Sequence, residues 1–264
     1  MKRLFVFAAL VLVFFFQSCE ETIDLDFQDI DPVIVVEAEL SNLSNQQEIR
    51  VNKTKSIFES GRFVYVEDAH VVVSTSKGQS FQFIHQGEGK YTHSNFIPQQ
   101  GVEYSLSVLS EGQHITAKST MQAYVEVDSL GFIEENILDQ SYDFVAIRFL
   151  DPNDEENYYK YTMSVNDKPA KFMAVFSDKL NNGRDVEHRF YDADNDFYQG
   201  DKVVVYRSLI SKEVFRYWNE YQRLTPSSSA PSNPTSNLSG GALGYFSINN
   251  TKRYTLEYTN MRQE

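Results

Sequence analysis

Hydrophobic and polar residues alternate along most of the chain after residue 31. This period of two is typical of strands that bury one face. Turn-forming Gly, Asn and Ser residues separate the runs of the first half at spacings of about ten residues, as in antiparallel sandwiches. We therefore predict an immunoglobulin-like β-sandwich over residues 31–123. Its expected strands are Pro32–Leu40, Glu48–Ile57, Ala69–Thr75, Ser80–His85, Tyr104–Leu109 and His114–Ser119.

The second half, residues 124–264, is expected to form another β-rich domain. Three runs rich in aromatic and β-branched residues indicate strands, since these side chains fit a pleated surface. They are Val125–Leu130, Tyr142–Leu150 and Tyr158–Asn166. The chain as a whole is thus predicted to be mainly β.

The period changes to that of a helix near residues 209–224, with Ser208 or Ser211 as the N-cap. The apolar stripe is Ile210, Val214, Tyr217, Trp218, Tyr221 and Leu224. An apolar helix face usually packs against a core, so we interpret the stripe as core rather than as a ligand platform. The sequence therefore predicts one amphipathic helix that covers an edge or a face of the sheet.

A Ser/Pro-rich loop over residues 225–241 follows the helix. Loops of this length inside a domain are usually functional or disordered. Gly240, Gly241 and Gly244 mark positions of positive φ or close backbone approach at the entry to a strand, Leu243–Ile248. A phosphate cradle is the other reading of these glycines, but no lysine follows at P-loop spacing.

The N-terminus carries a basic start, Met1–Arg3, and thirteen consecutive apolar residues, Leu4–Phe16. Thirteen residues at 1.5 Å each cover about 20 Å, less than the roughly 30 Å hydrocarbon core of a bilayer. This length indicates the apolar region of a signal peptide, residues 1–18, rather than a membrane span. A buried helix of the folded domain is the alternative.

The residues Ser18 and Cys19 resemble the lipobox of bacterial lipoproteins, although Gln17 is a looser choice than the usual small residue. The resemblance implies cleavage before Cys19 and lipidation of its thiol; a free thiol beside a cleaved signal is the alternative. Several acyl chains bind a membrane durably, since each buried CH₂ contributes about 0.8 kcal/mol. Cys19 is the only cysteine, so a lipidated chain has none left for disulfides, zinc or nucleophilic catalysis.

The charge of the chain is strongly negative, with 24 Lys+Arg against 37 Asp+Glu and a formal net charge of −13. Removal of residues 1–18 takes Lys2 and Arg3 away and makes it −15. A chain this acidic is a poor partner for nucleic acid, which binds through clustered Lys and Arg. The apolar content of 41% excludes wholesale disorder.

The first residues after the predicted cleavage site form an acidic tether, residues 19–30. Glu20, Glu21 and Asp24, followed by Asp26, resemble the export signal that moves lipoproteins of the Bacteroidota to the outer face of the outer membrane. A solvated tether is the alternative interpretation.

Candidate chemistry in the rest of the chain is sparse. The alternating carboxylates Asp192, Asp194 and Asp196 are a weak calcium candidate, since Phe197 stands where an EF-hand loop needs glycine; a solvated acidic turn is the alternative. The sequence contains no Gly-x-Ser-x-Gly nucleophile elbow, and no group of residues suggests acid/base catalysis. We therefore expect no catalytic residues and no cofactor besides the covalent lipid. The histidines show no metal-ligand spacing and are expected at the surface: His70, His85, His93, His114 and His188.

Ser129 lies in the tripeptide Asp128–Leu130, which resembles the acceptor sequence for O-glycans on exported proteins of the Bacteroidota. The resemblance implies modification of its hydroxyl. A strand at the junction of the two predicted domains could equally bury this side chain.

Several weak motifs together resemble the Bacteroidota outer-membrane lipoproteins called domain of unknown function 4249. The motifs are Pro32–Glu37, Ala69–Val73, Gly101–Leu106, Val127–Leu130 and the segment Asn237–Phe246 with its Gly-Gly and Leu-Gly-Tyr-Phe. The resemblance covers nearly the whole chain after Cys19. It implies a first half similar to carboxypeptidase-regulatory modules and gene neighbours that are often TonB-dependent receptors. It assigns no catalytic residues.

These expectations favour a surface-exposed, lipid-anchored protein of the outer membrane that acts by contact. The first hypothesis is a non-catalytic accessory subunit of an integral outer-membrane β-barrel protein, such as a TonB-dependent receptor, or of an assembly or secretion machine. The alternative is a lipoprotein that captures a nutrient itself, and a surface hydrolase is disfavoured. The loop 225–241, with the turn 192–196, is expected to be ordered by the barrel partner.

Overall fold

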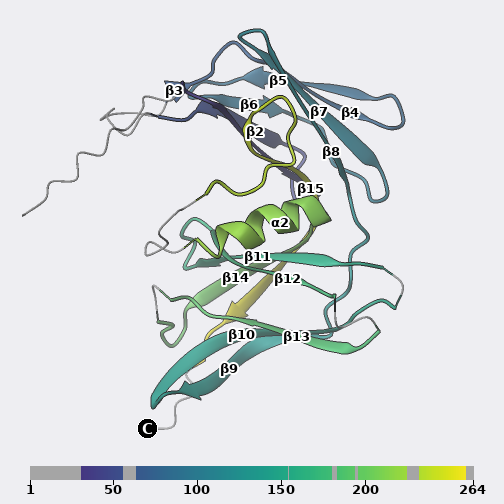
Figure 1. Cartoon of the computed structure of the whole chain (residues 1–264). Helices are drawn as coiled ribbons and strands as arrows, with labels where there is room; N and C mark the ends of the chain where they lie inside the picture. Colours follow the sequence, from purple (N-terminus) through teal and green to yellow (C-terminus); the bar gives the residue numbers. More distant parts are fainter. Residues whose placement is uncertain are drawn as a thin grey trace, which may run out of the picture. The chain divides into compact units, whose positions relative to one another are not determined.

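The computed structural model describes residues 31–55, 64–153, 155–179, 183–193, 196–224 and 232–259. Residues 32–264 form one compact unit. Its described part consists of strands and one helix (Figure 1), which confirms the mainly β, sandwich-like fold predicted from the alternating pattern.

The first half contains the predicted strands and two short additional ones. Side chains at alternate positions are buried in most of these strands, and their apolar faces pack into one cluster that includes Val36, Val73, Leu106 and Ile115. The strands are β1 (Ile34–Ser41), β2 (Gln47–Lys53), β3 (Val64–Tyr65), β4 (His70–Thr75), β5 (Ser80–His85), β6 (Lys90–His93), β7 (Glu103–Ser110) and β8 (Gln113–Thr120).

The second half contains more strands than the sequence pattern predicted. The expected strand over residues 125–130 is wrong for its first four residues, which carry no strand, and β9 begins at Ser129. The elements are β9 (Ser129–Ile137), β10 (Gln140–Leu150), β11 (Tyr158–Val165), β12 (Lys171–Ser177), β13 (Asp185–Phe190), β14 (Lys202–Leu209), α2 (Lys212–Tyr221) and β15 (Leu243–Glu257).

The strand β15 joins the two halves of the chain in one sheet. Its beginning pairs in parallel with β1, where Ala38 lies opposite Phe246 and Leu40 opposite Ile248. Its end pairs antiparallel with β14. The sheet therefore runs β12-β11-β14-β15-β1-β2-β6-β5-β4-β7-β8, with β3 beside β2, while β13-β10-β9 form a separate sheet.

The buried apolar residues form two large clusters, one mainly from the first half of the chain and one from the second half. The first takes in Met121 from the end of the first half and Phe246 and Ile248 from β15. The second includes Val125, Tyr159, Tyr161 and Met163. The first core is thus completed by residues far away in the sequence, which the local pattern of residues 31–123 did not indicate.

The helix α2 begins after Ser211, whose Oγ accepts a hydrogen bond from the Val214 amide. Ser211 is therefore the N-cap, and the alternative, Ser208, lies buried in β14. The helix packs against β11, β12 and β15, and Trp218 stacks on Phe172 with ring centroids 4.6 Å apart. The apolar stripe is thus core from Ile210 to Trp218, as predicted, whereas its last two members, Tyr221 and Leu224, are 48% and 39% exposed.

Candidate functional site

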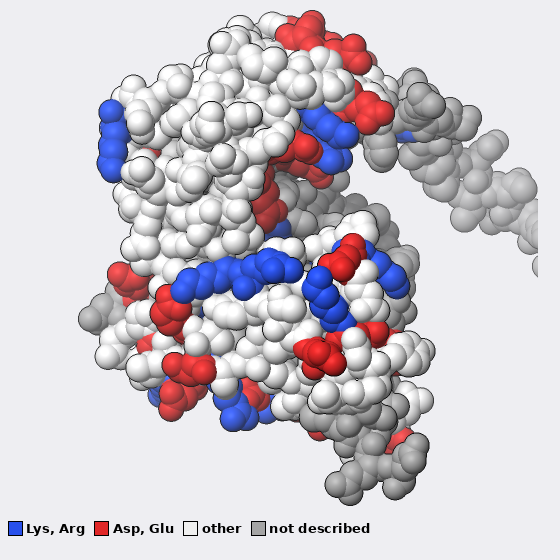
Figure 2. Space-filling model, turned by 180° about the vertical axis from the view of Figure 1, so that it is seen from behind, with Lys and Arg blue, Asp and Glu red and all other residues white. Residues whose placement is uncertain are grey.

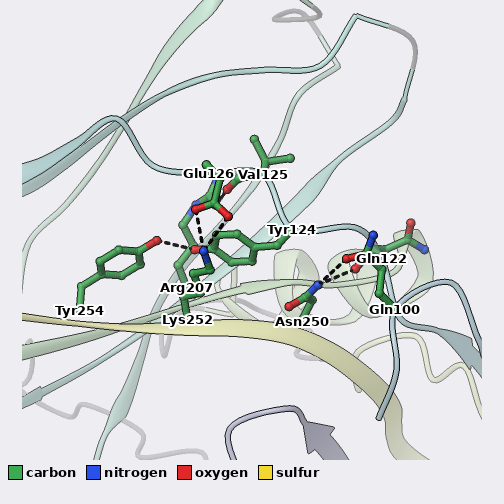
Figure 3. A network of polar contacts seen from close by, with 9 residues as sticks. All are labelled: Gln100, Gln122, Tyr124, Val125, Glu126, Arg207, Asn250, Lys252 and Tyr254. Carbon is green, nitrogen blue, oxygen red and sulfur yellow. Dashed lines mark hydrogen bonds and ion pairs between the residues drawn. The ribbon is translucent and has the colours of Figure 1, made fainter.

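The segment that connects the two halves, residues 122–126, is held by side chains of β14 and β15 (Figure 3). Arg207 Nη1 donates to the Val125 carbonyl oxygen at 2.5 Å. Lys252 Nζ lies 2.6 Å from both carboxylate oxygens of Glu126. Asn250 Nδ2 donates to the Gln122 carbonyl oxygen at 3.1 Å. Two backbone carbonyl groups of this segment, those of Gln122 and Val125, thus bond to side chains, and no strand forms before Ser129.

Arg207 is the largest fully buried side chain in the described part of the chain. Its alternation along β14 places it on the face of Val203, Val205 and Leu209, which are core residues. The guanidinium carbon lies 4.4 Å from the ring centroid of Phe149 and 4.5 Å from that of Tyr159. Aromatic faces attract cations when water is excluded, and these rings replace part of the hydration that Arg207 loses.

A chain of hydrogen bonds extends from Arg207 through Tyr161 to His188. Arg207 Nε donates to the Tyr161 hydroxyl oxygen at 3.1 Å, and that oxygen lies 2.8 Å from His188 Nδ1. Burial raises the pKa of Tyr161 to about 12. Burial, and then repulsion by Arg207, lower the pKa of His188 to about 3. The hydroxyl thus keeps its proton and the imidazole is neutral, and the tautomer of His188 sets which of the two groups donates in this hydrogen bond.

Asp151 ends the same polar cluster at the C-terminal end of β10. The Tyr159 hydroxyl donates to its Oδ1 at 2.7 Å, whereas Oδ2 is buried and has no hydrogen-bond partner among the described residues. Burial raises the pKa of the Asp151 carboxyl group. The nearby charge of Asp178 raises this pKa further, whereas Arg207 lowers it. Tyr159, Tyr161 and His188, whose pKa values are all strongly shifted by burial, therefore lie in a closed core, where their side chains contact one another.

A second polar network links β1 to β11 and β15. Lys160 is 3% exposed, and its Nζ lies 2.5 Å from Glu39 Oε2 and 4.1 Å from the ring centroid of Trp218. Tyr245 donates its hydroxyl proton to Glu39 at 2.8 Å, and Asn249 Nδ2 donates to Glu39 at 2.9 Å. Burial raises the pKa of Glu39, but Lys160 and these donors outweigh it, so the net pKa is lowered.

The segment Ser236–Gly244 closes the edge of the first half next to β8. The Ser239 amide donates to the Thr116 carbonyl oxygen at 2.8 Å, and Asn237 Nδ2 donates to the Phe246 carbonyl oxygen at 2.8 Å. Gly240 and Gly244 both have positive φ and lie against backbone oxygens of other strands. The sequence interpretation is therefore confirmed as close backbone approach for Gly240 and Gly244, and as positive φ for Gly241 as well.

The same contacts bear on the predicted role of the loop 225–241. Residues 225–231 lie outside the described part of the chain. Within the remainder, the Thr235 amide donates to Glu220 at 2.5 Å and Ser239 pairs with Thr116. The expectation that a partner orders this loop is therefore wrong for residues 235–241, because backbone and side-chain hydrogen bonds of the chain itself hold them.

The most exposed large apolar side chain among the described residues, Leu138, lies in the far half of the β9–β10 hairpin, residues 133–144, here called the hairpin arm. The third strand, β13, pairs with β10 only from Val145 to Leu150, so the arm extends beyond it as two strands. Leu138 at the turn is 93% exposed. Tyr191 packs at the base of the arm, with its ring centroid 5.1 Å from that of Phe144. This arm is the candidate surface for contact with another protein.

An open cavity of about 420 Å³ lies between β8 and the beginning of α2. Its lining is mostly polar, and Lys118 and Lys212 form ion pairs there with Glu103 and Glu156. Tyr158 is its aromatic residue. Positive and negative side chains are also interspersed over the face shown in Figure 2, with wide uncharged areas between them.

The predicted anchor and export signal lie outside the described residues. This applies to Cys19, Glu20, Glu21 and Asp24, so their lipidation and export remain predictions. Among the residues that the structure describes, no helix has the length and apolar character needed to cross a membrane.

The calcium candidate has one member, Asp194, outside the described residues. Asp192 is buried and bonds to the Lys171 ammonium group, while Asp196 is exposed. No group of three metal-ligating side chains is found in the described ranges. An ammonium group that already neutralises Asp192 competes with any cation there.

Ser129 lies at the first position of β9 and is exposed. The expectation that the histidines lie at the surface is wrong for His188, which is 3% exposed in the core between β11 and β13. In β13, His188 lies on the same buried face as Val186 and Phe190, because every second residue points to that face. That alternation is the sequence signal that could have placed it inside.

The fold and these sites define a mainly β, sandwich-like protein whose buried polar networks bind its strands to one another. The chain belongs to the family described as Domain of unknown function (DUF4249), whose model matches residues 20–255.

Among solved structures, the chain is similar to one titled "Biofilm associated protein - BSP domain", with 8% sequence identity and a TM-score of 0.25. That comparison covers 88% of this chain and 30% of the other one. The comparison with curated proteins gives no match.

Proposed function

We propose that this protein is a lipid-anchored, surface-exposed subunit of the outer membrane that assists an integral β-barrel protein by contact and without catalysis. The barrel is of the TonB-dependent receptor kind or belongs to an assembly or secretion machine. The observation that carries the proposal is the N-terminal sequence, in which the apolar run Leu4–Phe16 leads to Ser18 and Cys19. The family match begins at residue 20, directly after this cysteine.

Two features of the folded part support a role in contact. The hairpin arm exposes Leu138 at 93% in a turn where its φ is positive, and backbone strain of this kind concentrates at functional positions. Two ionisable groups with strongly shifted pKa values, His188 and Tyr161, lie in the core and bond to each other. Their arrangement serves to hold strands together.

A second candidate function is direct capture of a small nutrient, which the cavity beside β8 and α2 favours. Its volume of about 420 Å³ lies in the range of small-molecule sites. Its lining is polar and contains paired charges, so the ligand would be a polar molecule such as a sugar.

The proposed function is tested by purification of the tagged protein from outer membranes solubilised in mild detergent. We expect one β-barrel protein in a stoichiometric amount with the wild type. The Cys19→Ala variant should leave the membrane or remain as its precursor. A monomer without a barrel partner, with affinity for a sugar, would favour the capture function instead.

The surface location is tested separately. Replacement of Glu20, Glu21, Asp24 and Asp26 by alanine should keep the lipid but protect the protein from protease added to intact cells. Unchanged accessibility would reduce these carboxylates to a solvated tether.

A further inference from the structure

The turn of the hairpin arm has an unusual composition for its backbone geometry. Ile137 and Gln140 pair directly, so Leu138 and Asp139 form a two-residue turn, with φ of 49° and 63°. Positive φ at both central positions is typical of a type I′ turn, for which Asn-Gly is the favoured sequence. Leucine is strained there because its Cβ approaches the backbone in the left-handed region.

The strained leucine is also the most exposed large apolar residue. Leu138 is 93% exposed, and its neighbour Ile137 is 44% exposed. Among the described non-glycine residues with positive φ, Leu138 is the only apolar one. Leu138 thus has both a strained backbone and an apolar side chain in water. An interaction with another molecule best explains such a residue, since strain concentrates at functional positions.

The charge of the hairpin arm indicates what it binds. Residues 133–144 contain Glu134, Glu135, Asp139 and Asp143 and no Lys or Arg. Glu135 forms an ion pair with Arg189 of β13, and the carboxylate next to Leu138 in the turn is that of Asp139. An anionic lipid surface would repel this end. A second copy of a chain with a formal charge of −13 would bring like charges together as well. The arrangement fits an apolar pocket surrounded by Lys and Arg on a different protein.

We propose that the hairpin arm is the docking element of this protein, and that Leu138 inserts into an apolar, basic-rimmed pocket on the barrel partner. This inference rests on the proposed function for the identity of the partner. The turn geometry and the exposure of Leu138 are independent of it. Hot spots of interfaces are usually a few apolar anchors in such pockets, which a single leucine at the end of a two-stranded arm can provide.

The test uses the double variant Leu138→Asn with Asp139→Gly, which gives the turn its favoured sequence and removes the apolar anchor. We expect its melting temperature to rise by about 2–4 °C or more, as relief of strain predicts for a chain of this size. Copurification of the barrel protein should fall at least about tenfold. The control is Ile84→Thr, because Ile84 is 55% exposed on β5, and this variant should retain the partner.

A photo-crosslinking amino acid at position 138 identifies the occupant in intact cells. We expect adducts on a barrel peptide that contains Lys or Arg. Adducts on lipid or on a second copy would overturn the proposal, and so would full retention of the barrel by the double variant, which would leave the proposed function intact. An adduct on a protein that is not a barrel would overturn the proposed function but keep the docking role. A lower melting temperature of the double variant would refute the strain argument.

Discussion

Replacement of Gly244 by alanine tests whether β15 completes the first half of the chain. Gly244 has φ of +95°, and a Cβ atom there would lie 2.1 Å from the Val36 carbonyl oxygen. Val36 is its partner in the parallel β1–β15 pair. The added methyl group must therefore push apart the two backbones on which this pairing depends.

The cost follows from two contributions. A left-handed conformation costs an alanine about 1–2 kcal/mol relative to glycine, and forcing a group into a packed core costs about 1–3 kcal/mol. We therefore expect the free energy of unfolding to fall by about 2–5 kcal/mol. The adjacent core residues Phe246 and Ile248 would lose contacts with Ala38 and Leu40 as the strands separate.

The measurement is urea unfolding of the purified protein, monitored by circular dichroism and by the fluorescence of Trp218, the only tryptophan. Gly241→Ala is the matched control. Gly241 has φ of +80°, but the nearest atom to its added Cβ is a side-chain nitrogen of Gln113 at 3.7 Å. It carries the conformational cost without the clash, so it should lose only about 1–2 kcal/mol.

Equal losses of stability for the two variants would refute the reasoning, because the close approach to Val36 would then contribute nothing. A loss confined to one of the two probes would show instead that the halves unfold separately. The account predicts a clearly larger loss for Gly244→Ala in both signals, since β15 belongs to both halves.

Three further predictions concern single side chains. The pKa of His188 is lowered from 6.5 to about 3 in the folded protein, so unfolding takes up a proton between these values and stability falls as the pH drops through this window. His188→Asn, which keeps an acceptor for Tyr161, should flatten that slope in urea midpoints. The pKa of Glu39 is lowered from its ordinary 4.5, so its contribution is present above that value and is lost as the pH falls through the lowered pKa. Glu39→Gln should therefore destabilise at pH 7, and its difference from wild type should shrink as the pH falls below 4.5. The exposed Ser129 should carry a glycan in the native host, and equal intact masses of wild type and Ser129→Ala, apart from the lost oxygen, would exclude it.

The sequence was sufficient to predict six of the eight strands of the first half and the helix, because local periodicity determines them. The short strands β3 and β6 were not predicted. The runs containing Val36, Val73 and Leu106 each alternate with polar residues, and one buried face follows directly. The helix face with Val214 and Trp218 follows from the 3.6-residue period in the same way.

Long-range pairing and buried charge were not predictable from local pattern. The parallel pairing of Val36 with Gly244 joins residues about 200 positions apart, and neither strand alone specifies its neighbour. Arg207 occupies a core position of β14, and its polarity hides the strand from a search for alternating apolar residues. Its partners, including Tyr161 and the Val125 carbonyl group, are assembled only by the fold.

Native mass spectrometry of complexes extracted from the outer membrane in detergent tests the central claim most directly. The account predicts one particle that contains this chain, starting at Cys19 with the added mass of its acyl chains, and one β-barrel protein in a fixed ratio. A chain that retains residues 1–18, or one that lacks lipid and has no barrel partner, would contradict the account.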